Sequence, residues 1–118
     1  MSEPLEMLRS AGDFGALQRD SKSRAHPLLI LRWRRNELGH LRLGLSTGRR
    51  LGGAVVRNRV RRRLREAMRA AERRPPGGYD ILLVCRPQSA TATYAQLTEA
   101  LDRLLQRMYR DQGGQRTR

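Results

Sequence analysis

Hydrophobic and polar positions repeat every two residues in some segments and every three or four in others. The two-residue repeat predicts strands. Leucines alternate with polar or small residues over His40–Ser46, as in a strand with one buried face. The unbroken apolar run Tyr79–Arg86 is bounded by turn residues and predicts a central strand buried on both faces. A strand over Pro27–Trp33 precedes the turn-forming residues Arg34–Gly39, so we expect it to form an antiparallel hairpin with His40–Ser46.

Helices are expected where apolar residues recur at steps of three and four. The first covers Ala11–Arg19 behind Ser10, which has the spacing of a capping box with Asp13. The last follows a second capping box, made by Thr93 and Gln96. Between the second and third strands lies a further helix, which is strongly basic.

The order helix, strand, strand, basic helix, strand, helix predicts an α+β fold, a two-layer α/β sandwich with helices packed against a small mixed sheet. One further short strand is compatible with this order. The 118 residues predict one domain, residues 1–118, with an ordered core over about residues 8–110. We expect little order before residue 8, a polar connection over Asp20–His26, and a flexible basic tail over Gln112–Arg118.

The segment Arg49–Arg74 concentrates the charge, with eleven of the 25 Lys and Arg residues and two acids. An apolar stripe runs along one side of its helix, formed by Val56, Val60, Leu64, Ala67, Met68 and Ala71. The opposite side and its flanks carry Asn58, Arg59, Arg61, Arg62, Arg65 and Arg69. A preceding glycine pair, Gly52-Gly53, can bring backbone N–H groups to a phosphate. With a net charge of +14 the chain suits a polyanion, nucleic acid being the first candidate and an anionic membrane the second.

Residue types that carry chemistry are sparse, and we expect no catalytic residue and no metal site in this chain. The eleven acids are scattered without a pair spaced to hold Mg²⁺, and His26 and His40 are lone histidines. The glycines near the basic helix lack the Lys-Ser/Thr ending of a P-loop. The single cysteine, Cys85, lies in an apolar run, which favours a buried thiol in a reducing cytoplasm. Without a run of about 18 apolar residues or a signal peptide, a cytoplasmic protein with no membrane span is expected.

Three consecutive motifs resemble one family. Leu43-Gly-Leu-Ser46, Arg49-Arg-Leu-Gly52 and Ala54–Glu66 are similar, in residues and spacing, to the protein subunit of bacterial ribonuclease P. The signature of that family is a core such as Arg57-Asn58-Arg59 followed by a basic helix. The resemblance implies a small α/β sandwich in which a left-handed βαβ crossover, against the usual right-handed rule, carries this helix.

The resemblance also implies a function, the removal of the 5′ leader of precursor tRNA. A catalytic RNA would hydrolyse the phosphodiester bond with Mg²⁺, which that RNA would mainly bind. This chain would be the non-catalytic protein subunit of the endoribonuclease. Its implied partners are ribonuclease P RNA and precursor tRNA, with no membrane and no small-molecule substrate.

Binding residues follow from the same resemblance, position by position. The surface for the catalytic RNA would comprise Arg49, Arg50, Arg57, Asn58, Arg59, Arg61, Arg62, Arg65 and Arg69. The leader surface, beside the first helix, would comprise Phe14, Gln18, Arg32, Trp33, Arg42 and Ser46. Three positions depart from the family's usual pattern: Gln18 and Arg32 stand where aromatics are common, and Gly53 replaces a common asparagine. We expect leader binding to depend on arginine stacking and charge, or on Trp33 brought into place by a strand irregularity.

Two other functions stay open. A ribosomal or general RNA-binding protein without an enzymatic partner is the main alternative. A membrane-surface protein is a weaker one, because the apolar stripe of the basic helix lacks the aromatic residues that interfacial helices favour.

Overall fold

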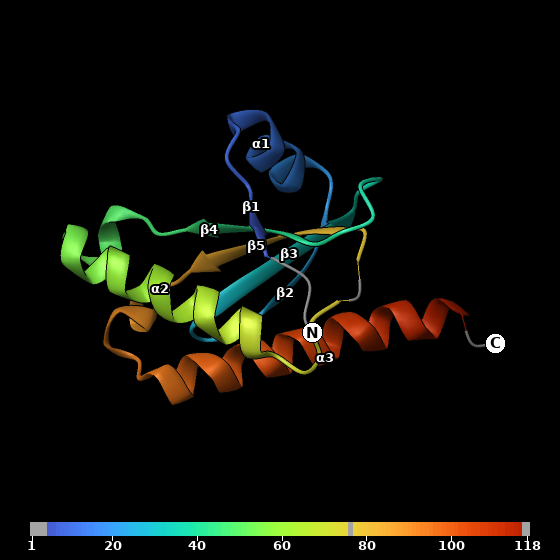
Figure 1. The fold of residues 1–118 in the computed structure, drawn as a ribbon. Helices are drawn as coiled ribbons and strands as arrows, with labels where there is room; N and C mark the ends of the chain where they lie inside the picture. Colours follow the sequence, from blue (N-terminus) through green and yellow to red (C-terminus); the bar gives the residue numbers. More distant parts are fainter. Residues whose placement is uncertain (1–4, 76, 117–118) are drawn as a thin grey trace.

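The computed structural model describes residues 5–75 and 77–116, with side chains as far as residue 111. Within these residues a five-stranded mixed sheet lies between two layers of helices (Figure 1). In chain order the elements are β1 (Glu6–Met7), α1 (Ala11–Arg19), β2 (Lys22–Ala25), β3 (Leu29–Arg35), β4 (Arg42–Ser46), the 3₁₀ turn η1 (Arg49–Leu51), α2 (Ala54–Ala70), β5 (Tyr79–Cys85), the 3₁₀ turn η2 (Pro87–Thr91) and α3 (Tyr94–Arg116).

The strands follow the order β1-β4-β5-β3-β2, with β5 at the centre of the sheet. This central place confirms the expectation from the unbroken apolar sequence of β5. β5 pairs antiparallel with β3 and parallel with β4. Because neighbouring parallel strands need a crossover connection, α2 forms the crossover between β4 and β5. The left-handed sense of this crossover stays a prediction from the resemblance.

The main hydrophobic core lies between the sheet and the helices α2 and α3, which cover the same face (Figure 1). Alternate residues of β3, β4 and β5 are fully buried in it: Leu29, Leu31, Trp33, Leu43, Ile81 and Leu83. The helices contribute the stripes expected from the sequence: Val60, Leu64, Ala67 and Met68 from α2, and Leu97, Leu101, Leu104, Leu105 and Met108 from α3. Burial of this apolar surface stabilises the fold and decides which side of α2 faces solvent.

α1 lies on the opposite face of the sheet, where it has a smaller core of its own (Figure 1). Leu17 is fully buried in a cluster with Leu8 and with Leu82 of β5. Phe14 and Val84 pack against this cluster and are partly buried. A helix of nine residues thus has one fully buried anchor, which makes its other contacts with the sheet important.

The predicted capping box of α3 is confirmed, whereas that of α1 is formed in one half only, because the Asp13 carboxylate binds Arg42 and not the backbone N–H of Ser10. At the start of α1 the backbone N–H of Asp13 donates to Ser10 Oγ, with an N–O distance of 3.0 Å. At the start of α3 the backbone N–H of Thr93 donates to Gln96 Oε1 at 2.9 Å, and that of Gln96 donates to Thr93 Oγ1 at 3.0 Å. These bonds satisfy N–H groups that have no partner inside the helix.

The predicted hairpin between Pro27–Trp33 and His40–Ser46 is wrong, because β5 lies between the two strands. The loop that joins them crosses the beginning of β5, where the backbone N–H of Asn36 donates to Gly78 O at 2.7 Å. Turn-forming residues suit such a crossing as well as a tight hairpin. A strand that is apolar on both faces is most stable in the middle of the sheet, and this decides the order.

Three predicted irregular segments also differ from the structure. The polar connection Asp20–His26 contains β2, an edge strand paired with β3, and its exposed side chains show no alternation that would mark a strand. The lead-in contains β1, which pairs with β4, while residues 1–4 lie outside the described residues. The tail expected from residue 112 is helical as far as Arg116, and residues 117–118 lie outside the described residues.

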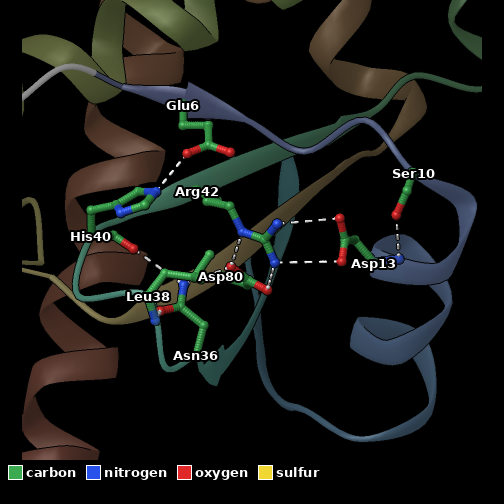
Figure 2. Close-up of polar contacts among 8 residues, drawn as sticks. All are labelled: Glu6, Ser10, Asp13, Asn36, Leu38, His40, Arg42 and Asp80. Atoms are coloured by element: carbon green, nitrogen blue, oxygen red, sulfur yellow. Dashed lines mark hydrogen bonds and ion pairs between the residues drawn. The ribbon is translucent and has the colours of Figure 1, made fainter.

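An ion-pair network centred on Arg42 joins α1, β4 and β5 (Figure 2). Arg42 donates to Asp80 from Nε at 2.9 Å and from Nη2 at 2.8 Å, so the two side chains form a bidentate pair. The same guanidinium contacts Asp13 of α1 at 3.3 Å and 3.4 Å. Asn36 Nδ2 also donates to Asp80, at 2.8 Å. The network therefore holds the first turn of α1 and the β3–β4 loop against the sheet.

Asp80 is the buried member of this network, with 5% of its surface exposed. Burial alone would raise the pKa of its carboxyl, but hydrogen bonds from Arg42 and Asn36 outweigh burial and lower the pKa below its ordinary value. The hydrogen bond to Asp80 in turn raises the pKa of Arg42. A carboxyl whose pKa is lower in the folded state stabilises the protein above the unfolded-state pKa of about 3.9.

Replacing Asp80 by Asn should lower the free energy of unfolding at pH 7 by about 3 kcal/mol, because Arg42 loses its buried counter-charge. The stabilisation by Asp80 is lost as pH falls through its lowered folded-state pKa, so the stabilities of wild type and variant should converge only at a pH below that lowered pKa. Urea unfolding at several pH values measures this difference. The control Asp102→Asn removes an exposed acid paired with Arg73 and should cost less than about 1 kcal/mol. Equal stability of D80N and wild type at pH 7 would contradict the role assigned to the pair.

Candidate nucleic-acid interface

The basic helix α2 is amphipathic in the way that its sequence predicts. Its apolar stripe is buried against the sheet and α3, whereas the opposite side faces solvent. Asn58, Arg62 and Arg69 are exposed. The flanking arginines are partly exposed: Arg57, Arg59, Arg61 and Arg65. One long side of α2 therefore offers guanidinium groups to a polyanion.

The arginines of α2 are not equivalent, because two of them bind the protein's own backbone. Arg59 Nη2 donates to Ala90 O at 3.1 Å, and Arg63 Nη1 donates to Ala92 O at 2.9 Å. These bonds attach α2 to the η2 segment. The prediction of Arg59 as an RNA contact thus applies to a side chain that also supports the fold.

A second group of arginines is free to bind a ligand. Within the described part of the chain, no hydrogen bond or ion pair involves the side chains of Arg62, Arg65 or Arg69. Arg61 makes a single long contact, 3.4 Å from Nη1 to Asn58 Oδ1. Few acids lie along this helix, so its positive charge is not neutralised within the protein.

The N-terminus of α2 extends the same basic surface. Gly53 is the N-cap and provides no side-chain acceptor, so the first backbone N–H groups of the helix lack a side-chain cap. Arg49 and Arg50, both exposed, lie in η1 just before it. The turn into the helix requires Gly52, whose φ of 134° is a conformation that other residues rarely adopt. Uncapped N–H groups beside two arginines suit a phosphate.

A different surface lies on the α1 side of the sheet. Strand register aligns Ser46, Val84 and Ile30 across β4, β5 and β3, and β2 continues this line with Ala25. We call these four residues the sheet row. Side chains directly opposite each other in a sheet share a face, and their neighbours Leu83 and Leu31 point into the main core. The sheet row is therefore on the face that carries α1, and each of its members is at least partly exposed.

Phe14 lies beside the sheet row because Gly44 leaves room for its ring. A Cβ atom at position 44 would lie 2.9 Å from Phe14 Cε1 and 3.0 Å from Leu8 Cδ1, which is too close. The aromatic ring of α1 therefore packs directly on the backbone of β4. Gln18 of the same helix is exposed, and Arg32 of β3 projects from the same face of the sheet. Phe14, Gln18, Arg32 and Ser46 are thus on one side of the molecule, as expected.

The prediction for Trp33 is wrong. Trp33 is 1% exposed and belongs to the main core, on the face opposite to Phe14. β3 and β5 pair without interruption from Leu29–Cys85 to Arg35–Tyr79, so no strand irregularity turns the indole outward. Of the two alternatives left open by the sequence, arginine stacking and charge is the one compatible with this geometry.

Arg42 lies on the predicted face but has another role. Its side chain is bound by Asp80 and Asp13, so it positions α1 and thereby Phe14. Sequence reasoning missed this network, since Asp80 stands inside the apolar run and its partners are far away in sequence. It also missed Ile30 and Val84, for which the period of two in β3 and β5 was the only available signal.

Membrane-spanning and metal-binding features are both missing from the described residues. Residues 5–75 and 77–116 contain no helix with both the length and the apolar character needed to span a membrane. The same part of the chain has no group of three or more His, Cys, Asp or Glu side chains placed to hold a metal ion. Cys85 is buried, and burial raises the pKa of its thiol to about 12.

Comparison with known protein sequences gives one consistent description. The family model described as Ribonuclease P matches residues 3–109. The ribonuclease P protein component of Roseiflexus castenholzii is 38% identical over 101 residues, which cover 85% of this chain and 83% of that protein. The corresponding protein of Herpetosiphon aurantiacus is 35% identical over 101 residues, covering 86% and 82%.

Solved structures agree with the sequence comparison. The RNase P protein of Staphylococcus aureus superposes with a TM-score of 0.79 at 26% identity, covering 86% of this chain and 94% of that chain. The RNase P protein from Thermotoga maritima gives a TM-score of 0.77 at 29% identity, with coverage of 86% and 96%. Both likenesses extend over most of the chain.

Proposed function

Since the chain belongs to the family of bacterial ribonuclease P protein subunits, we propose that it binds the catalytic RNA through α2 and the 5′ leader of precursor tRNA through the sheet face beside α1. As a ribonuclease P protein component it is part of an endoribonuclease complex. The observation that carries the proposal is the separation of the two surfaces: α2 and the sheet row lie on opposite faces of one sheet.

The first surface is proposed for the catalytic RNA because its cations have no partners within the described protein. Arg62, Arg65 and Arg69 project to solvent from a helix held rigidly by its buried stripe. Guanidinium groups bind phosphate oxygens through two parallel hydrogen bonds, and such contacts need no particular base. Arg49, Arg50, Arg57, Asn58 and Arg61 extend the surface to the start of the helix.

The second surface is proposed for the leader because it combines an aromatic ring with polar and apolar side chains on a flat sheet. Single-stranded RNA exposes its bases, which stack on aromatic rings and on guanidinium planes. Phe14 supplies the ring, and Arg32 can supply a guanidinium plane in place of the aromatic residue common in the family. Ser46 and Gln18 offer hydrogen bonds at either side.

Hydrolysis is assigned to the RNA partner, together with the Mg²⁺ that it requires. Two acids on the α1 side of the sheet, Asp13 and Asp80, are both engaged by Arg42, so they do not form a free carboxylate pair for a metal. The protein's proposed part is to hold the leader and to lower the repulsion between two RNA molecules. We expect this activity in the cytoplasm. A general RNA-binding role without an enzyme partner is not favoured by the family match.

Adding the protein to its cognate catalytic RNA should lower the Mg²⁺ concentration needed to cleave precursor tRNA, since 25 basic residues offset RNA repulsion in place of metal ions. Cleavage rates measured over a Mg²⁺ titration, with and without protein, test this. If the two titrations coincide, the proposed function fails. Cleavage by protein freed of RNA would contradict the assignment of hydrolysis to the RNA partner.

The double variant Arg62→Ala/Arg65→Ala should bind the catalytic RNA more weakly and with less salt dependence. The slope of log affinity against log salt should fall by about 0.7–0.9 for each phosphate group that the variant no longer binds. The matched control Arg73→Ala/Arg103→Ala removes the same charge from two exposed arginines that pair with Asp102 and Glu99. An equal change of slope in both double variants would show that α2 is not a specific surface.

Replacing Phe14 by Ala should weaken binding of precursor tRNA by about 1–3 kcal/mol, the usual contribution of one stacked base. Binding of mature tRNA should be unchanged, because mature tRNA has no leader. Phe14→Leu keeps most of the apolar packing on Gly44 and removes the ring, so it separates stacking from folding. Normal precursor affinity in a folded Phe14→Leu protein would exclude Phe14 from the leader surface.

A further inference from the structure

Three arginines from distant parts of the chain meet at the β2 edge of the sheet. Arg24 of β2 and Arg107 and Arg110 of α3 line a shallow cavity of about 280 Å³, together with Asp111. We call Arg24, Arg107 and Arg110 the edge cluster. None of them belongs to the surfaces assigned above to the catalytic RNA or to the leader.

The edge cluster has excess positive charge. Arg24 Nη2 pairs with Asp111 at 2.7 Å, which offsets one of the three cations. Arg107 uses one N–H group to donate to Ala25 O at 3.0 Å, and its charge is not paired within the described chain. Among the described residues no side chain binds Arg110. The positive charge also affects the nearby His26. Burial lowers the pKa of its imidazole, the charges of Arg103 and Arg107 lower it further, and the charge of Glu99 opposes them.

A hydrogen bond from Arg107 to Ala25 places the edge cluster next to one end of the sheet row. Ala25, whose carbonyl binds Arg107, is the last member of the sheet row. At the other end of that row, Ser46 is followed within a few residues by Arg49 and Arg50. The row crosses four strands, a width of about 14 Å at the usual strand spacing. The sheet row thus leads to arginines at both of its ends. At the β2 edge these arginines lie towards the α3 side, because Arg24 is in register with Leu31, which points into the main core.

An extended RNA strand fits this arrangement. A leader that enters beside Arg49 and Arg50 and crosses the sheet row reaches the β2 edge, and its next phosphates meet the edge cluster when the strand passes round that edge towards α3. No other element covers β2, because all four of its residues are exposed, so an RNA strand can reach this edge of the sheet. Arginine recognises phosphate by charge and by paired N–H donors, without regard to the base.

We propose that the edge cluster binds the backbone of the distal 5′ leader, beyond the nucleotides that lie on the sheet row. This inference rests on the proposed function of the sheet row and adds a second, sequence-independent contact to it. It makes leader length, rather than leader sequence, a determinant of precursor affinity. An acidic protein segment would also suit three arginines, but it would not explain their continuity with the sheet row.

The test uses the complete complex of protein and catalytic RNA, with two precursors whose leaders have about 4 and about 16 nucleotides, the range that single-strand binding surfaces cover. Wild type should bind the long-leader precursor more tightly. Arg107→Ala/Arg110→Ala should weaken long-leader binding by roughly three- to tenfold and lower its salt slope by about 1.4. Binding of the short-leader precursor should not change.

Two further variants make the outcome specific. Arg110→Ala alone removes a side chain with no partner in the described structure, so its expected smaller loss on the long leader does not arise from misfolding. Arg35→Ala/Arg73→Ala removes the same charge as the double variant from two exposed arginines outside the edge cluster and should leave the preference for long leaders intact. Thermal unfolding of each variant confirms that the fold is kept.

The inference is overturned if wild type binds both precursors equally, or if Arg107→Ala/Arg110→Ala weakens both by the same factor. Either result leaves the sheet row as the leader surface, provided that the protein still lowers the Mg²⁺ needed to cleave the short-leader precursor. If that Mg²⁺ effect is also absent, the proposed function fails with it. The two failures are therefore distinguishable.

Discussion

The alternation of side chains along three adjacent strands is the constraint on which the rest of the structure depends. In β3, β4 and β5 every second residue enters the core shared with α2 and α3, and the residues between them face α1. Registered pairing carries this division across the whole sheet. A slip of one residue would exchange Trp33 with Arg32, and would place cations in the core. The two proposed RNA surfaces exist because this division is strict.

The arginines of this fold have two different roles, structural support and ligand binding. Some arginines are structural: Arg42 holds α1, while Arg59 and Arg63 hold the η2 segment through backbone carbonyls. Others have no partner in the described protein: Arg62, Arg65 and Arg69 on the solvent side of α2, and Arg110 at the β2 edge. Of the basic residues behind the net charge of +14, some are thus bonded within the protein, and the others are available to bind RNA phosphates.

Much of the fold could be predicted from the sequence, and the failures have physical causes. Helix starts and the central strand were predictable because capping boxes and an unbroken apolar run are local signals. Strand pairing was not, since turn residues between β3 and β4 do not say whether a third strand lies between them. β2 escaped notice because an exposed edge strand needs no apolar side chains. For the site, arginine positions on α2 followed from helical period, but whether Trp33 faced RNA or core depended on strand register.

The burial of Trp33 also decides what spectroscopy can observe in this protein. It is the single tryptophan of the chain, and it lies in the core on the face opposite to α1. Its intrinsic fluorescence should therefore report the integrity of the α2–α3 side of the sheet and stay nearly silent when a ligand occupies the other side. Unfolding can be followed without a label, whereas RNA docking calls for a dye placed elsewhere.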